Sequence, residues 1–143
     1  MQYKITSQQQ MIDLGKKIAS DFKGGDIVLL YGDLGAGKTT LTKGIASYFE
    51  INDVVSPTFT LMQEYTLQKT KANCRKLVHI DTYRLENEED LIEIGAEDYL
   101  GDENTVCVVE WPEKLTKLLS DKKVIKIMIE HDGEDGRIIK IED

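Results

Sequence analysis

The sequence predicts one α/β domain over residues 1–143, with a mixed parallel and antiparallel central sheet flanked by helices. Three observations support this prediction. First, an apolar strand at 26–31 leads through glycines into a helical pattern at 38–49. Second, 77–81 and 105–110 have the composition of buried strands. Third, 124–142 alternates around a polar turn, as a β-hairpin does. A chain of 143 residues is long enough for one proper hydrophobic core.

The first elements are a short strand at 2–6 and a helix. Ser7 and Gln10 fit a capping box at the start of that helix. Gly24 and Gly25 are expected to end it. Its apolar positions recur at helical spacing and are Met11, Leu14, Ile18 and Phe22.

The middle of the chain predicts an antiparallel hairpin over 59–81. The polar stretch 68–75 is expected to be its exposed turn. An acidic helix is expected to begin at Glu86 and to end near Gly95. The remaining elements, in order, are a strand at 105–110, a short helix at 113–119 and a closing hairpin of 124–130 with 137–142.

Composition restricts the class of protein. The net charge of −8 argues against a broad basic face that grips nucleic acid alone. An acidic surface could meet a basic partner, although simple solubility is the favoured explanation. No apolar run approaches the roughly 20 residues of a membrane span, and the N-terminus lacks a signal-peptide pattern. Cys74 and Cys107 form no C-x-x-C pair, so we expect a cytoplasmic location.

The stretch after the first apolar strand carries the clearest chemical signal. It follows the pattern G-x-x-x-x-G-K-T, formed by Gly32, Gly37, Lys38 and Thr39, with Gly35 inside it. These glycines should adopt positive φ and bring backbone N–H groups to a polyphosphate. The lysine supplies a charge for the β and γ phosphates, and the threonine hydroxyl suits Mg²⁺. Since strand and helix flank the motif, it predicts a P-loop NTPase fold rather than a glycine turn that binds nothing.

A second acidic ligand for magnesium is expected at the end of a neighbouring strand. Asp81 follows one apolar strand and Glu110 follows another. Either could hold the metal directly or through water while the other orients the attacking water. Spacing does not choose between them, and one of the two could be an acid that merely faces solvent.

Three further positions give weaker signals. Thr58 and Thr60 occupy the place of a switch loop that could sense the γ-phosphate, although S-P-T is also common turn chemistry. His79 is expected to point into the sheet or to bond locally rather than to act as a base. Trp111 is either a core anchor or a partner-facing aromatic.

Missing motifs disfavour other classes of P-loop protein. The sequence has no N-K-x-D motif, and its D-x-x-G at 98–101 does not directly follow an apolar strand, which disfavours a GTPase. The arginines are Arg75, Arg84 and Arg137, too few for the clamp of a small-molecule kinase, and no lid-sized insertion is visible. Transfer to water, or no efficient acceptor until a partner arrives, fits better.

Several segments together resemble the bacterial TsaE family, also called YjeE. They are GDLGAGKTTLTKG, SPTFTLMQEY, HIDTYRL, IGAEDYL and VVEWPEKL, in the family's order and spacing. The resemblance covers about residues 5–140. It implies an ATPase with weak activity alone, which acts in tRNA threonylcarbamoyladenosine biosynthesis.

The resemblance also implies partners. These are a threonylcarbamoyl-transferase complex of TsaB and TsaD type subunits, which modifies adenosine 37 of tRNAs reading ANN codons. ATP binding and hydrolysis are thought to reset that complex between cycles. The tRNA would be held through the complex, which agrees with the acidic charge. The short C-terminus lacks the tail that some members carry.

Roles for single residues follow from the same resemblance. Lys38, Asp81, Thr58 and Thr60 would support catalysis, and Thr39 with Glu110 would bind Mg²⁺. Gly136 would lie near the adenine. The phosphates of ATP or ADP would be held by Gly32 and by the segment Gly35, Ala36, Gly37, Lys38, Thr39 and Thr40. Two other functions stay open: a nucleotide-gated binding module whose hydrolysis is incidental, and a small-molecule kinase.

Overall fold

The computed structural model describes residues 1–54 and 61–143, and a seven-stranded sheet forms its centre. The strands are β1 (Gln2–Ile5), β2 (Ile27–Tyr31), β3 (Met62–Lys71), β4 (Cys74–Asp81), β5 (Thr105–Glu110), β6 (Ile125–Asp132) and β7 (Gly136–Glu142). Their order across the sheet is β1-β7-β6-β2-β5-β4-β3. β2 pairs in parallel with β5 and β6, and β4 pairs in parallel with β5, whereas β1–β7, β6–β7 and β3–β4 are antiparallel. The predicted mixed sheet is confirmed.

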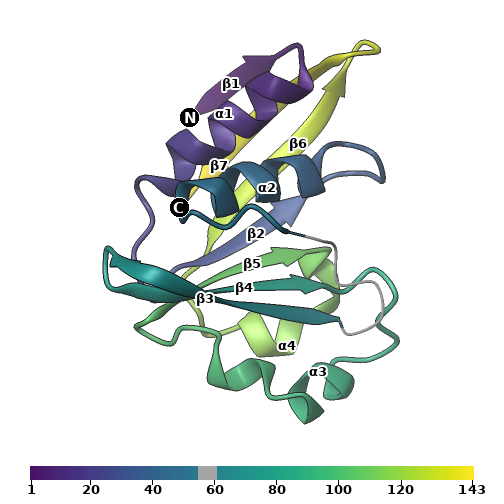
Figure 1. Cartoon of the computed structure of the whole chain (residues 1–143). Helices are drawn as coiled ribbons and strands as arrows, with labels where there is room; N and C mark the ends of the chain where they lie inside the picture. Colours follow the sequence, from purple (N-terminus) through teal and green to yellow (C-terminus); the bar gives the residue numbers. More distant parts are fainter. Residues whose placement is uncertain (55–60) are drawn as a thin grey trace.

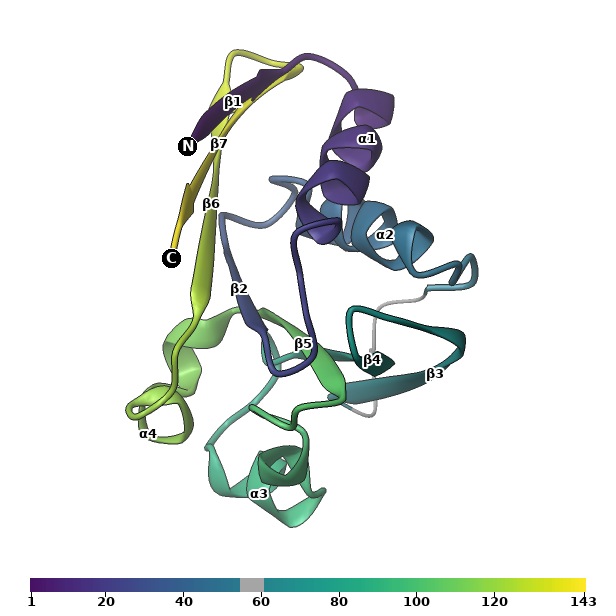
Figure 2. The same cartoon turned by 90° about the vertical axis from the view of Figure 1, so that its left-hand side faces the viewer.

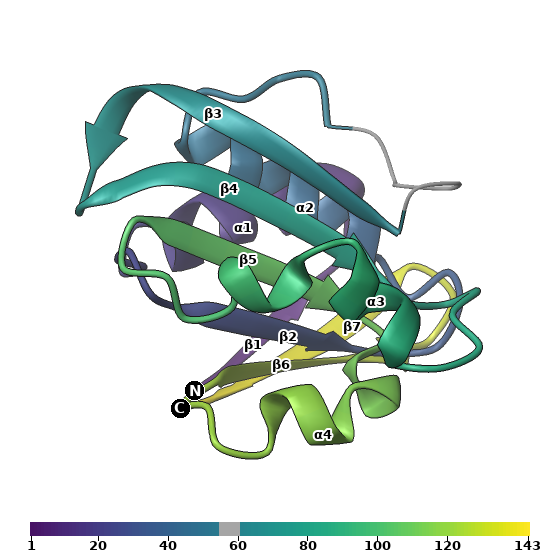
Figure 3. The ribbon, with the colours of Figure 1, turned by 90° about the horizontal axis from the view of Figure 1, so that it is seen from below.

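Helices cover both faces of this sheet. They are α1 (Gln8–Ala19), α2 (Lys38–Tyr48), α3 (Glu89–Glu93) and α4 (Thr116–Leu119), with 3₁₀ turns η1 (Ala96–Asp98) and η2 (Pro112–Lys114). α1 and α2 lie on one face, and the shorter α3 and α4 lie on the other (Figures 1 and 2). Seen from below, α3 and α4 stand in front of the sheet, and the two termini lie side by side (Figure 3). No helix within residues 1–54 or 61–143 is both long and apolar enough to span a membrane.

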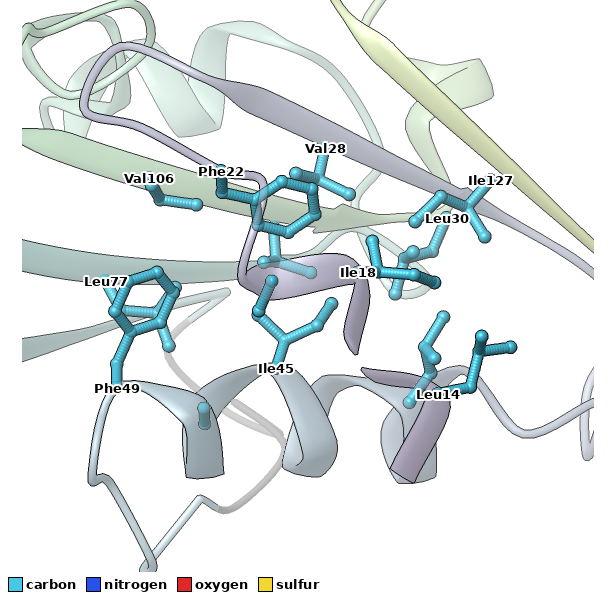
Figure 4. Packing of buried hydrophobic residues seen from close by; sticks show 14 of the residues in the cluster. Leu14, Ile18, Phe22, Val28, Leu30, Ile45, Phe49, Leu77, Val106 and Ile127 are labelled. Atoms are coloured by element: carbon cyan, nitrogen blue, oxygen red, sulfur yellow. The ribbon is translucent and has the colours of Figure 1, made fainter. Parts of the chain in front are cut away.

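Strand alternation divides the core into two clusters. On β2, Val28 and Leu30 face α1 and α2, whereas Ile27 and Leu29 face α3 and α4. Figure 4 shows the first cluster, in which Ile45 of α2 packs near the β2 side chains. Since both faces are covered by apolar side chains, the central strands are apolar throughout, as the sequence predicted.

The predicted capping box begins α1, but the Gln10 side chain bonds one residue before the N-cap, at Thr6 rather than Ser7. The Gln10 N–H donates to the Ser7 hydroxyl oxygen at 3.1 Å, and the Gln10 side-chain oxygen accepts from the Thr6 N–H at 2.7 Å. The helix ends at Ala19, earlier than the predicted extension to Phe22. Phe22 is nevertheless buried, so its helical spacing reflects core packing beyond the helix end.

The predicted exposed turn at 68–75 is wrong. β3 continues to Lys71 and β4 begins at Cys74, so only Ala72 and Asn73 form the turn, with φ of 48° and 65°. β3 is an edge strand, so its polar side chains remain in solvent without leaving the strand. The polar composition of 68–71 therefore indicated an exposed edge strand and not a turn.

The short helices also differ from the predicted ranges. α3 begins later than Glu86, and Gly95, with φ of 87°, separates it from η1. The predicted helix at 113–119 is two short turns, η2 and α4. The segment of α3 and η1 and the segment of η2 and α4 both lie on the side of the sheet away from α2.

Candidate functional site

The glycine-rich loop joins β2 to α2 and reaches the sheet edge where parallel strands end. Gly35 and Gly37 have φ of 80° and 112°, which side chains rarely adopt, as predicted. Gly32 does not have positive φ. A Cβ there would lie 2.9 Å from the Ile129 carbonyl oxygen, so this glycine is required by close approach to β6. The prediction of positive φ is therefore correct for two of these three glycines.

Lys38 begins α2, and its side chain folds back into the loop. Its Nζ donates to the Gly32 carbonyl oxygen at 2.5 Å and lies 3.3 Å from the centre of the Trp111 ring. Burial lowers the pKa of this ammonium, and the negative charge of Glu110 is the strongest opposing influence. The charge is thus held at the loop by a carbonyl oxygen and an aromatic face.

Two carboxylates lie side by side at the ends of β4 and β5. Asp81 and Glu110 are in register across this parallel pair. Because Leu77 on β4 and Val108 on β5 face α2, alternation turns both acids toward α2 as well. Burial raises the pKa of the Asp81 carboxyl, and the Glu110 charge adds to this, while a hydrogen bond from the Tyr83 N–H (3.0 Å) opposes it.

His79 lies on the same face of β4, two residues before Asp81. It is fully buried, and its Nε2 is 2.5 Å from Glu110 Oε2. The expectation that His79 bonds locally is confirmed. Its partner, however, is one of the candidate magnesium ligands.

Trp111 follows Glu110 directly and has an unusual backbone. Its φ of 59° is rare for a bulky residue, and the Thr82 hydroxyl oxygen lies 2.5 Å from its carbonyl oxygen. Its ring lies against Tyr83, with centroids 5.2 Å apart. This conformation places the indole beside the Lys38 ammonium, so Trp111 is neither a simple core anchor nor a freely projecting aromatic.

These residues surround a cavity of about 480 Å³. Its lining includes the loop residues Gly35, Gly37, Lys38, Thr39 and Thr40, together with Asp81, Glu110 and Trp111. Leu34, Leu61, Tyr83 and Arg84 also line it and were missed from the sequence. The adjacency of Tyr83 and Arg84 to Asp81 was the signal available for two of them. Thr58 and Thr60 lie outside the described residues.

A second hollow of about 320 Å³ lies against other parts of the same loop. Gly35, Ala36 and Thr40 line it, with Asp135 from the β6–β7 turn and Arg137 from the start of β7. Arg137 Nε donates to the Ala36 carbonyl oxygen at 2.9 Å, which ties this turn to the loop. Gly136 lies between two lining residues. A Cβ on it would be 2.3 Å from the Asp132 carbonyl oxygen, so glycine is needed there for the turn itself.

The donor set suits magnesium bound together with a phosphate. Thr39, Asp81 and Glu110 supply oxygen atoms to one cavity, and none of the described residues that line it offers a sulfur or imidazole ligand. Within the described part of the chain, no three His, Cys, Asp or Glu side chains form a metal cluster. Mg²⁺ usually binds through one or two carboxylates, with phosphate and water completing its shell, so such a cluster is not required.

The burial of the Asp81 carboxyl, with the Glu110 charge beside it, predicts that Asp81→Asn stabilises the free protein. The raised pKa means that ionised Asp81 is less favourable folded than unfolded, so its charge lowers stability as pH rises through the folded pKa. We expect the melting temperature at pH 7 to rise by about 1–3 °C. The gain should shrink as pH falls toward 3.8, the ordinary Asp value. Thermal unfolding at several pH values measures this, and a lower melting temperature at pH 7 would contradict it.

A phosphate loop between a parallel strand and a helix, with carboxylates at neighbouring strand ends, defines a P-loop NTPase-type protein. The sequence profile described as "Threonylcarbamoyl adenosine biosynthesis protein TsaE" matches residues 5–139. The chain therefore belongs to the TsaE family, which acts in tRNA threonylcarbamoyladenosine biosynthesis.

Individual relatives agree with this assignment. The chain is 35% identical over 140 residues to the Bacillus subtilis tRNA threonylcarbamoyladenosine biosynthesis protein TsaE, covering 97% of this chain and 83% of that protein. The Rickettsia conorii protein of the same name is 36% identical over 141 residues, covering 97% and 76%. A crystal structure of Bacillus subtilis YdiB superposes with a TM-score of 0.79 at 31% identity, covering 99% of this chain and 83% of that one.

Proposed function

We propose that this chain, acting as one domain over residues 1–143, is an ATP-binding and ATP-hydrolysing subunit. It would support threonylcarbamoylation of adenosine 37 in tRNAs that decode ANN codons, by resetting the threonylcarbamoyl-transferase complex between cycles. The observation that carries the proposal is the cavity in which Lys38 meets Asp81 and Glu110. Family membership supplies the pathway, and this cavity supplies the chemistry.

In this proposal the loop from Gly32 to Thr40 binds the phosphates of ATP or ADP. Gly35, Ala36 and Gly37 offer backbone N–H groups, that of Ala36 after it leaves the Asp33 carbonyl oxygen to which it donates at 3.0 Å. The N-terminus of α2 adds its positive dipole. The Lys38 ammonium moves from the Gly32 carbonyl oxygen to the β and γ phosphates, a short movement within the loop. The hollow beside Thr40 and Arg137 suits the nucleoside, so Gly136 lies at a turn near the adenine.

Thr39 and Glu110 would hold Mg²⁺, and Asp81 would serve hydrolysis. When bound, Mg²⁺ neutralises charge on the β and γ phosphate oxygens. A carboxylate with a raised pKa takes a proton more readily than an ordinary one, which suits Asp81 to orient and deprotonate the attacking water. Thr58 and Thr60 are proposed to contact the γ-phosphate, by resemblance to the family.

The partners are proposed to be TsaB and TsaD type subunits, with tRNA held through them in the cytoplasm. The net charge of −8 disfavours tight binding of tRNA by this chain alone. The described arginines near the cavity do not form a kinase-like clamp, because Arg84 lines it while Arg137 is bonded to loop carbonyls. Water is therefore the favoured acceptor, and activity should be low until partners bind.

The test is multiple-turnover formation of threonylcarbamoyladenosine on tRNA. The assay contains the carbamoyl-adenylate synthase and both transferase subunits, with or without this protein. We expect cycling beyond one turnover only when it is present, and loss of cycling with Glu110→Gln. Glu130→Gln, which changes an exposed glutamate on β6, is the matched control and should behave as wild type.

Three outcomes would contradict the proposal. Equal cycling without the protein would remove it from this step, whatever nucleotide it binds. Full cycling with Asp81→Asn, in a variant shown not to hydrolyse ATP, would support a nucleotide-gated binding module instead. Transfer of phosphate from ATP to a metabolite without a protein partner would favour a kinase.

A further inference from the structure

We propose that His79 is a positioning residue that holds the Glu110 carboxylate in place for Mg²⁺. The imidazole binds one carboxylate oxygen, Oε2, at 2.5 Å, and Glu110 also lines the cavity, so Oε1 is the oxygen that we assign to the metal. This inference rests on the proposed function, because it takes Glu110 as a magnesium ligand. His79 is not among the residues proposed above to contact the phosphates or the metal, so its role is an addition to that proposal.

The strand register explains why His79 reaches Glu110. His79 is opposite Val108 and Asp81 is opposite Glu110 in the parallel β4–β5 pair. Side chains two residues apart lie on one face of a strand, so His79 and Asp81 both point toward α2. Glu110 therefore has Asp81 directly across from it and His79 on the diagonal.

The surroundings of the imidazole determine which nitrogen carries the proton. Nδ1 is the only fully buried side-chain nitrogen or oxygen without a hydrogen-bond partner in residues 1–54 and 61–143. An N–H at Nδ1 would be a buried donor without an acceptor, which costs free energy, whereas an N–H at Nε2 has Glu110 Oε2 as its acceptor. The tautomer with its proton on Nε2 is therefore favoured, and Nε2–H donates to Glu110 Oε2.

Without His79, Glu110 would have a competing partner. The Glu110 charge is the strongest of the charges acting on the Lys38 ammonium, yet no salt bridge joins these two side chains in the described structure. A direct Lys38–Glu110 pair would occupy both the phosphate-binding cation and the metal-binding anion. By binding Oε2, His79 holds the Glu110 carboxylate toward β4 and leaves Lys38 at the loop.

The first experiment measures the Mg²⁺ dependence of nucleotide binding with a fluorescent ADP analogue. His79→Leu removes the donor at similar volume, and we expect the apparent Mg²⁺ affinity to fall about 10- to 100-fold. Affinity for the analogue without Mg²⁺ should change little, because His79 is not among the residues that line the cavity. His79→Gln can still donate from its amide and should recover part of the loss. His131→Gln, which changes the exposed histidine on β6, is the matched control.

A second experiment reads the hydrogen bond directly, without nucleotide or metal. The chain has two histidines, so the His131→Gln protein contains a single imidazole, that of His79. Its ¹⁵N spectrum should show one neutral tautomer protonated at Nε2, and added Glu110→Gln should shift the Nε2–H signal. A proton on Nδ1, or rapid exchange between tautomers, would overturn the inference.

The binding data separate failure of this inference from failure of the proposed function. If Glu110→Gln loses Mg²⁺ dependence while both folded His79 variants match wild type, the positioning role is wrong and the metal role stands. If Glu110→Gln retains wild-type Mg²⁺ dependence, the metal role and the positioning role are both wrong. If His79→Leu unfolds, equal Mg²⁺ affinity of His79→Gln and Glu110→Gln would still overturn the inference, since the amide donor should preserve part of the affinity.

Discussion

Lys38→Ala is expected to abolish repeated cycling of the transferase complex and to reduce ATP hydrolysis by about 100- to 1,000-fold, as loss of a preorganised charge typically does. The Lys38 ammonium is already inside the phosphate loop, bonded to the Gly32 carbonyl oxygen. Nothing else in the described lining of the cavity can replace it, because Arg84 comes from the segment after β4 rather than from the loop. The measurements are multiple-turnover modification and ATPase rate with all partners present.

Lys43→Ala is the matched control for this variant. Lys43 lies on the same helix, α2, but is exposed, so its removal changes net charge and helix composition equally without touching the cavity. We expect both rates to stay within about twofold of wild type, since exposed substitutions have small effects. Equal losses in the two variants would mean that general charge, and not the position of Lys38, supports activity.

Trp111 fluorescence offers an independent measurement of the movement of Lys38 to a bound phosphate. It is the only tryptophan, and the Lys38 ammonium lies 3.3 Å from its ring centre. Movement of that ammonium to a bound phosphate should change Trp111 fluorescence in the wild type. In Lys38→Ala the free protein should already differ, and nucleotide should cause little further change.

Much of this site could be predicted from the sequence because its parts are local. The phosphate loop is one continuous stretch, and Asp81 and Glu110 each end an apolar strand. Once those strands are parallel neighbours, their ends must meet at one edge. The pairing of His79 with Glu110 could not be predicted, because it depends on the register between β4 and β5. The positions of Trp111 and Thr82 depend on the same register and on a backbone conformation that composition does not signal.

The packing of α1 against α2 is a second feature that the sequence did not reveal. Gly15 and Gly44 lie inside helices, where glycine usually weakens structure. A Cβ on Gly44 would lie 2.3 Å from the Ile12 carbonyl oxygen, and one on Gly15 would lie 2.6 Å from the Leu41 carbonyl oxygen. The two helices therefore approach through backbone at this crossing. Only distances between elements far apart in sequence show this need for glycine.

Gly44→Ala is accordingly expected to destabilise the protein by about 2–3 kcal/mol, the cost of overpacking a tight contact. The opposing effect is the better helix propensity of alanine, worth about 1 kcal/mol, so the sign of the result decides which effect wins. We expect a fall of about 5–10 °C in melting temperature. Thermal and urea unfolding measure it, and Lys43→Ala, an exposed substitution on the same helix, reports propensity and charge effects without the clash.

The crossing also connects stability to the site, because α2 begins with Lys38 and Thr39. If alanine at position 44 pushes α2 away from α1, the phosphate loop moves with it, and nucleotide affinity should fall along with stability. A folded Gly44→Ala protein with lower stability but unchanged affinity would show that the loop is held from the β6–β7 side, where Arg137 binds the Ala36 carbonyl oxygen. A gain in stability would mean that the helices lie farther apart than the carbonyl contacts indicate. The expected joint loss would identify the α1–α2 crossing as the support on which the phosphate-binding end of α2 depends.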